Sequence, residues 1–149
     1  MIVKKTPAEI DRMARAGEIL VRTMDLLAGK VRPGVTTLEL DEAAERFIRS
    51  HGATPAFKGY RGFPGSICAS PNDMVVHGIP GKFKLSRGDV LSVDIGVVYD
   101  GWVADAARTF PVGEVDPVAA HFEFTIAITA DGPRILTPWH ESKARVAAA

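Results

Sequence analysis

Apolar residues recur at helical spacing in the first part of the chain. The run from Thr6 to Glu9 combines a threonine cap, a proline at the first helical position and a glutamate that can close a capping box. Beyond it, one apolar face repeats every three or four residues: Ile10, Met13, Gly17, Leu20, Met24 and Leu27. Gly29 and the Arg-Pro-Gly run after it end the pattern, which predicts a helix that packs on another element.

A second amphipathic helix is predicted to start at Thr36, with Glu39 placed for another capping box. Gly52 marks its end. The apolar face of this helix consists of Leu40, Ala43, Ala44, Phe47 and Ile48.

After the second helix, short apolar runs are broken by Gly and Pro, a pattern typical of strands and loops in a curved antiparallel sheet. Beyond Glu114, another alternating run carries an Asp131-Gly132 turn signal. Helices followed by strands predict the α+β class. We expect a single domain over residues 1–137 and a disordered tail at 138–149, where no helix or strand face is evident.

Two aspartates flank the pair Asp100-Gly101, which favours a two-residue hairpin loop. In that register Asp105 lies opposite Gly96, and Asp94 shares a face with Gly96 because side chains alternate along a strand. We therefore expect Asp94 and Asp105 to be diagonal neighbours, with backbones roughly 7 to 8 Å apart. Their carboxylates can converge on one point.

Converging carboxylates in an apolar sheet are unfavourable unless their repulsion is cancelled. The two aspartates can share a proton, pair with Arg108 or Lys82, or bind a cation. Gly96 opposite Asp105 is expected to leave room for an ion, which favours the metal hypothesis beyond what the spacing alone supports.

Two further polar residues interrupt apolar surroundings. Glu123 lies in an alternating segment, where it is either an edge-strand charge or a third metal ligand. His77 lies between an apolar run and a Gly-Ile-Pro turn. A hydrogen bond that fixes the loop is the common role of such a histidine, and contact with a substrate amide at a pocket rim is the functional alternative.

Composition limits the classes of function. The chain has 149 residues, 46% of them hydrophobic and 24% charged, with a formal net charge of zero, so nothing draws it to nucleic acid or membrane. No uncharged stretch is long enough to span a bilayer. The single cysteine, Cys68, cannot form an internal disulfide, and we expect a cytoplasmic protein that binds a small or peptide ligand.

Five long stretches are specific enough to compare with known families: TPAEIDRMARAG, VRPGVTTLELD, GYRGFPGSICASPNDMVVHGIP, LSRGDVLSVDIGVVYDGWVADAARTFPVG and AHFEFTIAITADGPRILT. Together they resemble type I methionine aminopeptidase over about Met1 to Thr137. The resemblance implies a pita-bread fold of two pseudo-symmetric halves around a dinuclear metal site, which removes the initiator methionine from new polypeptides.

The same resemblance implies roles for individual residues. Asp94, Asp105 and Glu123 match metal ligands, for ions such as Co, Mn, Fe, Zn or Mg. His77 matches a histidine that contacts substrate near the scissile bond. The positions that match the methionine pocket, each of which could instead be plain core or loop packing, are Phe57, Tyr60, Phe63 and Cys68.

The chain departs from the family pattern between Glu114 and Ala120, where a large internal deletion is expected. The metal-binding histidine of a Gly-His-Gly-Ile-Gly run and the glutamate of a Thr-Ile-Glu-Pro run are both absent from the sequence. Most of the second half of the fold is therefore expected to be missing, with one bound ion or none instead of two. His121 is a candidate substitute ligand, although a solvent-bound rim histidine is the commoner role.

These observations leave three hypotheses about function. The first is metal-dependent removal of N-terminal methionine from nascent polypeptides, by a monomer that could associate with the ribosome. The second is an inactive, pita-bread-derived peptide-binding module or a misfolded deletion product. An Xaa-Pro aminopeptidase relative is the third, and it fits the GYRGFPGSICASPNDMVVHGIP run less well.

Overall fold

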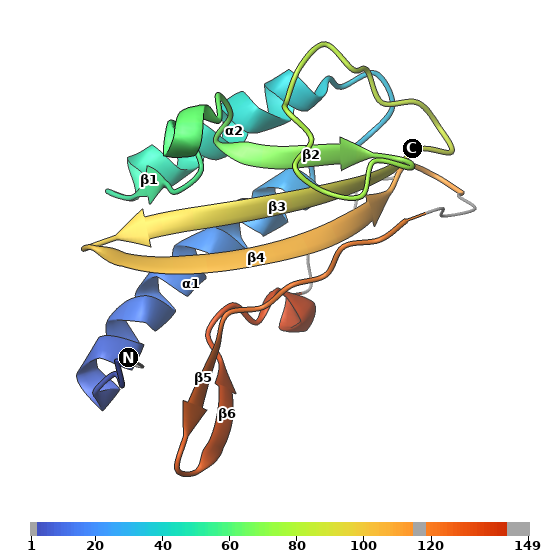
Figure 1. The fold of residues 1–149 in the computed structure, drawn as a ribbon. Coiled ribbons are helices and arrows are strands. Elements are labelled where there is room, and N and C mark those ends of the chain that lie inside the picture. The colour runs from blue at the N-terminus through green and yellow to red at the C-terminus, as the bar shows by residue number, and fades with distance from the viewer. Residues whose placement is uncertain (1–2, 115–118, 143–149) are drawn as a thin grey trace.

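A computed structural model describes residues 3–114 and 119–142. Two helices, α1 (Pro7–Ala28) and α2 (Thr37–Ser50), lie along one face of a four-stranded antiparallel sheet (Figure 1). The strands of this sheet are β1 (Thr54–Pro55), β2 (Ile67–Pro71), β3 (Val90–Tyr99) and β4 (Trp102–Pro111). A separate hairpin follows, made of β5 (Ile126–Thr129) and β6 (Gly132–Ile135), and short 3-10 turns occur at η1 (Tyr60–Gly62) and η2 (Trp139–Glu141).

Both predicted helix starts are confirmed. In α1 the Thr6 side chain accepts a hydrogen bond from the Glu9 backbone N–H, while the Glu9 carboxylate bonds the Thr6 backbone N–H. Thr36 and Glu39 form the same reciprocal pair at α2. Each box satisfies backbone donors that a helix start leaves unpaired, which fixes where the helix begins.

The central strand of the sheet is β3. Strand β4 pairs along one edge of β3, and β1 and β2 share the other edge end to end. The turn between β3 and β4 is Asp100-Gly101, with positive φ values of 50° and 76°, as a type I′ hairpin requires. Gly96 pairs with Asp105, so the predicted register is confirmed.

The two faces of the sheet differ in chemistry. The face toward the helices carries the apolar core, whose largest fully buried side chains include Leu20, Met24, Leu27, Leu40, Ile48, Leu91, Val93, Ile95 and Phe110. The other face carries Cys68, Ser92, Asp94, Asp105 and Thr109, because these residues alternate with the core residues along their strands. No helix in the described part of the chain is long and apolar enough to cross a membrane.

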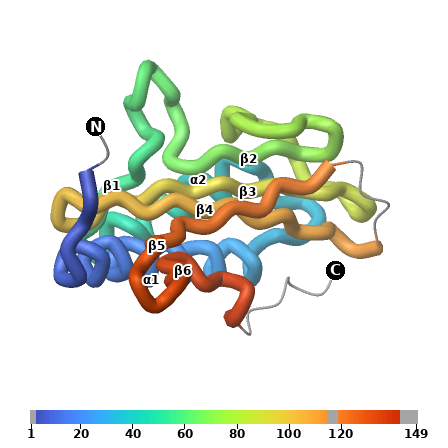
Figure 2. The backbone as a smooth tube through the Cα atoms, turned by 60° about the horizontal axis from the view of Figure 1, so that its bottom comes forward, coloured from blue at the N-terminus to red at the C-terminus, as the bar shows by residue number. Residues whose placement is uncertain are grey.

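Residues 119–142 attach along the β4 edge of the sheet, and Trp139 and Phe124 of this segment also pack against the core. Glu123 bridges Ala107 of β4 through two backbone hydrogen bonds, and the segment runs beside β4 before the β5–β6 hairpin (Figure 2). The loop of that hairpin is Ala130-Asp131, one residue before the predicted Asp131-Gly132, because Gly132 takes the positive φ of 112° as the first residue of β6.

The prediction of a disordered tail from residue 138 is wrong for its first five residues, 138–142. Trp139 in η2 is only 9% exposed, because its ring stacks on Phe124 with centroids 4.8 Å apart. Its indole N–H also donates to the Glu123 carbonyl at 3.1 Å. Residues 143–149 lie outside the described residues, as do 115–118, within the proposed deletion junction.

Candidate metal and peptide site

The polar face of the sheet brings the predicted carboxylates into two adjacent rows. Cys68 pairs with Asp94, which pairs with Ala107, which pairs with Glu123. Asp105 lies in the next row, opposite Gly96. Because all these side chains project from the same face, Asp94, Asp105 and Glu123 lie on one side of the sheet.

A cavity of about 660 Å³ opens on this face. It is lined by the eight residues that match family site positions, Phe57, Tyr60, Phe63, Cys68, His77, Asp94, Asp105 and Glu123, but not by the candidate substitute ligand His121. Arg61, Gly62, Pro64 and Ile79 complete its wall. The sequence-based assignments therefore converge on one hollow, and their chemical roles remain predictions.

The two aspartates are held in an unfavourable environment. Burial raises the pKa of both carboxyls above the ordinary aspartate range, and the negative charge of Asp94 raises the pKa of Asp105 further. The carboxyls are close enough to hydrogen-bond each other once one is protonated. Even so, Oδ1 of Asp94 and Oδ1 of Asp105 are buried without any hydrogen-bond donor.

Pairing with arginine does not relieve this charge. Arg108 lies on the opposite face of β4, where its guanidinium stacks over the rings of Phe110 and Trp139 at 4.9 and 5.5 Å. Neither aspartate forms an ion pair with Lys or Arg anywhere in residues 3–114 and 119–142. A shared proton and a bound cation remain as ways to cancel the repulsion between the two aspartates. The two oxygens that lack hydrogen-bond donors are suited to either.

The space expected above Gly96 is already filled. A Cβ placed on Gly96 would lie 2.7 Å from the ring of Phe57 and 2.8 Å from Cβ of Ala56. The glycine is therefore required by close packing of the loop before η1, and the idea that it leaves room for an ion is wrong. The hollow lies beside the aspartates instead, along the wall formed by Cys68 and His77.

Glu123 does not complete a preformed metal site. Its Oε2 lies 3.1 Å from Nε2 of His121, two residues earlier on the same strand face. Nowhere among the described residues do three His, Cys, Asp or Glu side chains gather closely enough to hold a metal ion. The donor set thus fits a cation through the aspartate pair, with Glu123 in the row of Asp94 and in contact with His121.

One known protein family matches most of the chain. The sequence pattern of metallopeptidase family M24 matches residues 11–142. The chain belongs to metallopeptidase family M24.

Individual M24 proteins support this assignment. The chain is 55% identical over 119 residues to a methionine aminopeptidase of Clostridium perfringens, covering 80% of this chain and 48% of the relative. The crystal structure of methionine aminopeptidase from Rickettsia prowazekii aligns with a TM-score of 0.76 at 41% identity, over 78% of this chain and 47% of that one. An Xaa-Pro dipeptidase from Bacillus anthracis aligns less well, with a TM-score of 0.66 at 28% identity over 75% of this chain and 30% of that one.

The M24 chain spans about half the length of the curated relatives it matches. The α+β class and the incomplete pita-bread fold are confirmed, since the structure superposes on about half of a methionine aminopeptidase. The deletion between Glu114 and Ala120 stays a prediction.

The loop around His77 forms one rim of the M24 cavity. His77 is exposed and has a positive φ of 60°, a conformation uncommon for a residue with a side chain. Its neighbour Gly78 is fastened to β2, because the Gly78 N–H donates to the Ser70 hydroxyl at 3.0 Å and its carbonyl accepts from Ala69. A Cβ at Gly78 would overlap the Ala69 carbonyl. This tight attachment holds the unusual backbone of His77 at the rim.

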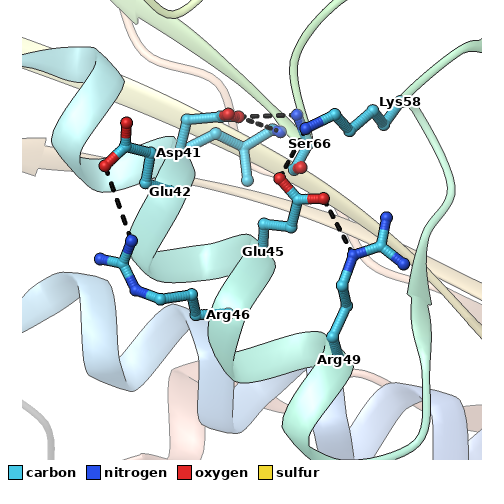
Figure 3. A network of polar contacts seen from close by, with 8 residues as sticks. Asp41, Glu42, Glu45, Arg46, Arg49, Lys58 and Ser66 are labelled. Carbon is cyan, nitrogen blue, oxygen red and sulfur yellow. Dashed lines mark hydrogen bonds and ion pairs between the residues drawn. The ribbon is translucent and has the colours of Figure 1, made fainter.

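Asp41 of α2 holds the start of β2, the strand whose Cys68 lines the cavity, a role that the sequence analysis missed. Its Oδ1 accepts hydrogen bonds from the backbone N–H groups of Ser66 and Ile67 at 2.6 and 2.9 Å, which anchors the start of β2 (Figure 3). Burial raises the pKa of Asp41. The available signal was an acidic residue directly beside Leu40 on the apolar face of a helix, where charge is unfavourable unless it is bonded.

Glu45, one helical turn after Asp41, fastens the loop that carries Phe57. Its carboxylate contacts Lys58 Nζ at 2.6 Å and Arg49 Nε at 2.9 Å (Figure 3). Lys58 directly follows Phe57, whose ring lines the cavity. Helix α2 therefore supports the apolar wall through its surface charges as well as through its buried face.

Proposed function

We propose that this M24 chain binds the N-terminal methionine of a peptide in its cavity, together with a divalent cation held by Asp94 and Asp105. The observation that carries the proposal is the convergence of the assigned residues on one hollow of about 660 Å³. Metal dependence is the established property of the family, and the methionine specificity belongs to the relatives.

The aspartate pair would hold the cation through its two orphaned oxygens. A bound divalent ion supplies a water of lowered pKa for attack on a peptide carbonyl. Glu123, on the same side of the sheet, contributes a further carboxylate near the pair, and its charge raises the pKa of both aspartates. A cation at this point would reverse the electrostatic disadvantage of three neighbouring carboxylates.

The apolar wall would receive the methionine side chain. Phe57, Tyr60, Phe63 and Cys68 supply rings and a neutral thiol, because burial, followed by the charges of nearby aspartates, raises the pKa of Cys68 to about 12. Phe57 and Phe63 are half-buried, so they keep surface available to a ligand. His77 at the rim would donate a hydrogen bond to the oxygen of the scissile amide.

Turnover by this chain should be slow. The resemblance places a metal-binding histidine and a glutamate that acts as general base in runs that this sequence lacks. Loss of a general base alone typically lowers the rate about a hundred- to ten-thousand-fold. We further propose nascent polypeptides in the cytoplasm as the source of the peptide, with ribosome association as an extension of that role.

Metal titration tests the cation site. Mn²⁺ followed by electron paramagnetic resonance should bind weakly, at about one ion per chain, and Asp105→Asn should weaken binding more than tenfold by removing one of two oxygen donors, roughly the effect of one buried charge. Asp100→Asn, in the exposed turn of the same hairpin, is the matched control. Two tightly bound ions, or unchanged binding in Asp105→Asn, would rule the site out.

Peptide hydrolysis tests the substrate. A Met-Ala-Ser peptide should bind in the presence of Mn²⁺ yet release methionine at close to the background rate, and Phe57→Ala should abolish binding. Phe83→Ala removes an exposed ring outside the cavity and should have no effect. Binding that is equally strong for an Ala-Pro-Ser peptide would favour the Xaa-Pro class. Methionine release within about tenfold of a longer relative, abolished by EDTA, would show that the missing groups are not needed.

A further inference from the structure

His121 lies beside the candidate site without lining its cavity, whereas Glu123, two residues later, does line it. The Nε2 atom of His121 lies 3.1 Å from Oε2 of Glu123. An ionised carboxylate can only accept hydrogen bonds, so Nε2 carries the hydrogen and His121 is the donor. The imidazole therefore holds the Glu123 carboxylate from outside the cavity.

The backbone of His121 is fixed to the main sheet by a side chain of β4. Oγ1 of Thr109 accepts a hydrogen bond from the His121 backbone N–H at 2.8 Å and donates one to the His121 carbonyl at 3.1 Å. Because this uses the only hydrogen of the Thr109 hydroxyl, the hydroxyl of Ser92, 2.9 Å away on β3, donates to it. Ser92 is only 5% exposed. A chain of hydrogen bonds thus runs from the central strand of the sheet to Glu123.

The Glu123 side chain needs such a contact to keep one position. It is 47% exposed, whereas the His121 side chain is 22% exposed. A half-exposed glutamate loses rotamer freedom when it is fixed, and the negative charges of Asp94 and Asp105 repel its carboxylate. Without a donor to hold it, the carboxylate would turn away from the aspartates into solvent.

We propose that His121 is a positioning residue, which holds the Glu123 carboxylate beside Asp94 and Asp105, where it can reach the cation. This inference rests on the proposed function, because the cation is the one assigned there to the aspartate pair. Hydrogen-bond partners that orient metal ligands commonly contribute about 10- to 100-fold to metal affinity. To act as a ligand itself, His121 would have to release Glu123 and enter a cavity that its ring does not line.

Mn²⁺ titration followed by electron paramagnetic resonance tests this role. His121→Leu should raise the dissociation constant for Mn²⁺ about tenfold, whereas His121→Gln, which keeps an N–H donor, should stay within about twofold of the wild type. In the Glu123→Gln background, His121→Leu should have little further effect, because the histidine acts through the glutamate. His51→Leu is the matched control, since His51 lies at the end of α2 and outside the cavity.

Pulsed electron paramagnetic resonance separates orientation of the glutamate from direct ligation. A histidine nitrogen bound to Mn²⁺ modulates the spin echo, and any such nitrogen signal should be the same in the wild type and in His121→Leu. A nitrogen signal that disappears in His121→Leu would overturn the proposal in favour of ligation by His121. Equal loss of affinity in His121→Gln and His121→Leu would overturn it as well.

A measurement without metal keeps this inference separate from the proposed function. In the metal-free protein, side-chain coupling constants from NMR should report one rotamer of Glu123 in the wild type and in His121→Gln, and averaging over rotamers in His121→Leu. If the wild type binds no Mn²⁺, the proposed function fails, and the rotamer of Glu123 still decides whether His121 holds it. Averaging in the wild type, or a single rotamer in His121→Leu, would overturn the inference with or without a cation.

Discussion

The body of the protein, residues 3–114, and the C-terminal segment, residues 119–142, are stabilised in different ways. In the body, two helices cover one face of the sheet and bury Leu20, Met24 and Ile95 completely. In the segment, Ile128 is the most exposed large hydrophobic residue of the described chain. The segment is held by hydrogen bonds along the edge of β4 and by a few buried side chains: Leu136, Thr137 and Trp139.

This difference divides the site into two parts, one fixed by the main sheet and one positioned by contacts of the C-terminal segment. Asp94 and Asp105 belong to the body, where the hairpin register fixes them. Glu123 belongs to the segment, and its place depends on the bridge to Ala107 and on the Trp139 indole that donates to its carbonyl. Changes in the body should unfold the protein, whereas changes at the junction should release Glu123 from the site and leave the aspartates in place.

The largest effect should come from the body. Leu20→Ala removes a fully buried side chain on α1 and should lower the free energy of unfolding by about 2–5 kcal/mol, because a cavity remains. Urea unfolding followed by circular dichroism measures the change. Leu38→Ala, at a position 41% exposed on α2, should lower it by less than about 1 kcal/mol. Equal losses at both positions would mean that the helices do not form the core described above.

A smaller effect is expected where the two regions meet. A Cβ at Gly17 of α1 would overlap the Leu136 carbonyl, so Gly17→Ala should displace the segment, with a loss of about 1–3 kcal/mol. Hydrogen exchange at residues 123–137 should accelerate while that of β3 stays slow. Gly29→Ala is the control, since the new Cβ would lie 3.6 Å from its nearest neighbour, the Leu26 carbonyl oxygen. Uniform acceleration in both regions would remove the distinction between them.

The aspartates should make the metal-free protein sensitive to pH. Burial and the charge of Asp94 raise the pKa of Asp105 from 3.8 to about 8, so the folded state binds this proton more tightly than the unfolded state does. The contribution of Asp105 to stability is therefore fully present below its unfolded-state pKa and is lost as pH rises through the folded-state pKa. In EDTA, Asp105→Asn should reduce the loss between about pH 5 and pH 8 by about 1 kcal/mol, a value discounted for partial exposure.

Thermal melting at several pH values measures this effect, and Asp100→Asn should leave the pH dependence unchanged. The charged groups that face Asp105 are Asp94 and Glu123, and Asp94, whose pKa is also raised, contributes to the slope in the same direction. A steeper loss of stability in Asp105→Asn than in the wild type would contradict the assigned direction.

The smallest effect is expected at the hairpin. Arg134→Gln removes the ion pair with Asp11, whose side chains are 50% and 63% exposed, and should lower stability by only about 0.2–1 kcal/mol. A double-mutant cycle with Asp11→Asn, repeated at high salt, isolates the pair. A coupling that persists in high salt would indicate a better-shielded contact than the structure describes.

Local patterns in the sequence were sufficient for the body. Thr6 and Thr36 predicted the helix starts correctly, because capping depends on residues close together in the chain. Asp100-Gly101 set the strand register for the same reason, and with it the shared face of Asp94 and Asp105. Features that depend on contacts between residues far apart in the sequence could not be predicted from these local patterns.

Three such features illustrate the limit. The space above Gly96 is occupied by Phe57, a contact between a strand and a distant loop. The guanidinium of Arg108 lies over two aromatic rings, and one of them, Trp139, comes from a stretch expected to be a tail. Asp41 appears in the sequence as one more helical acid, and only the fold reveals the β2 backbone that it binds.

The two-residue turn at Asp100-Gly101 also decides how the chain tolerates changes in length. Deleting or inserting one residue there would shift β4 against β3 by one position and send Asp105 to the helix side, into the places of Ala104 and Ala106. A two-residue insertion would return Asp105 to the polar face, one row away from its present neighbour. Natural variation in length should therefore be rare at this turn and more frequent at the Ala130-Asp131 loop, where no site residue depends on the strand that follows.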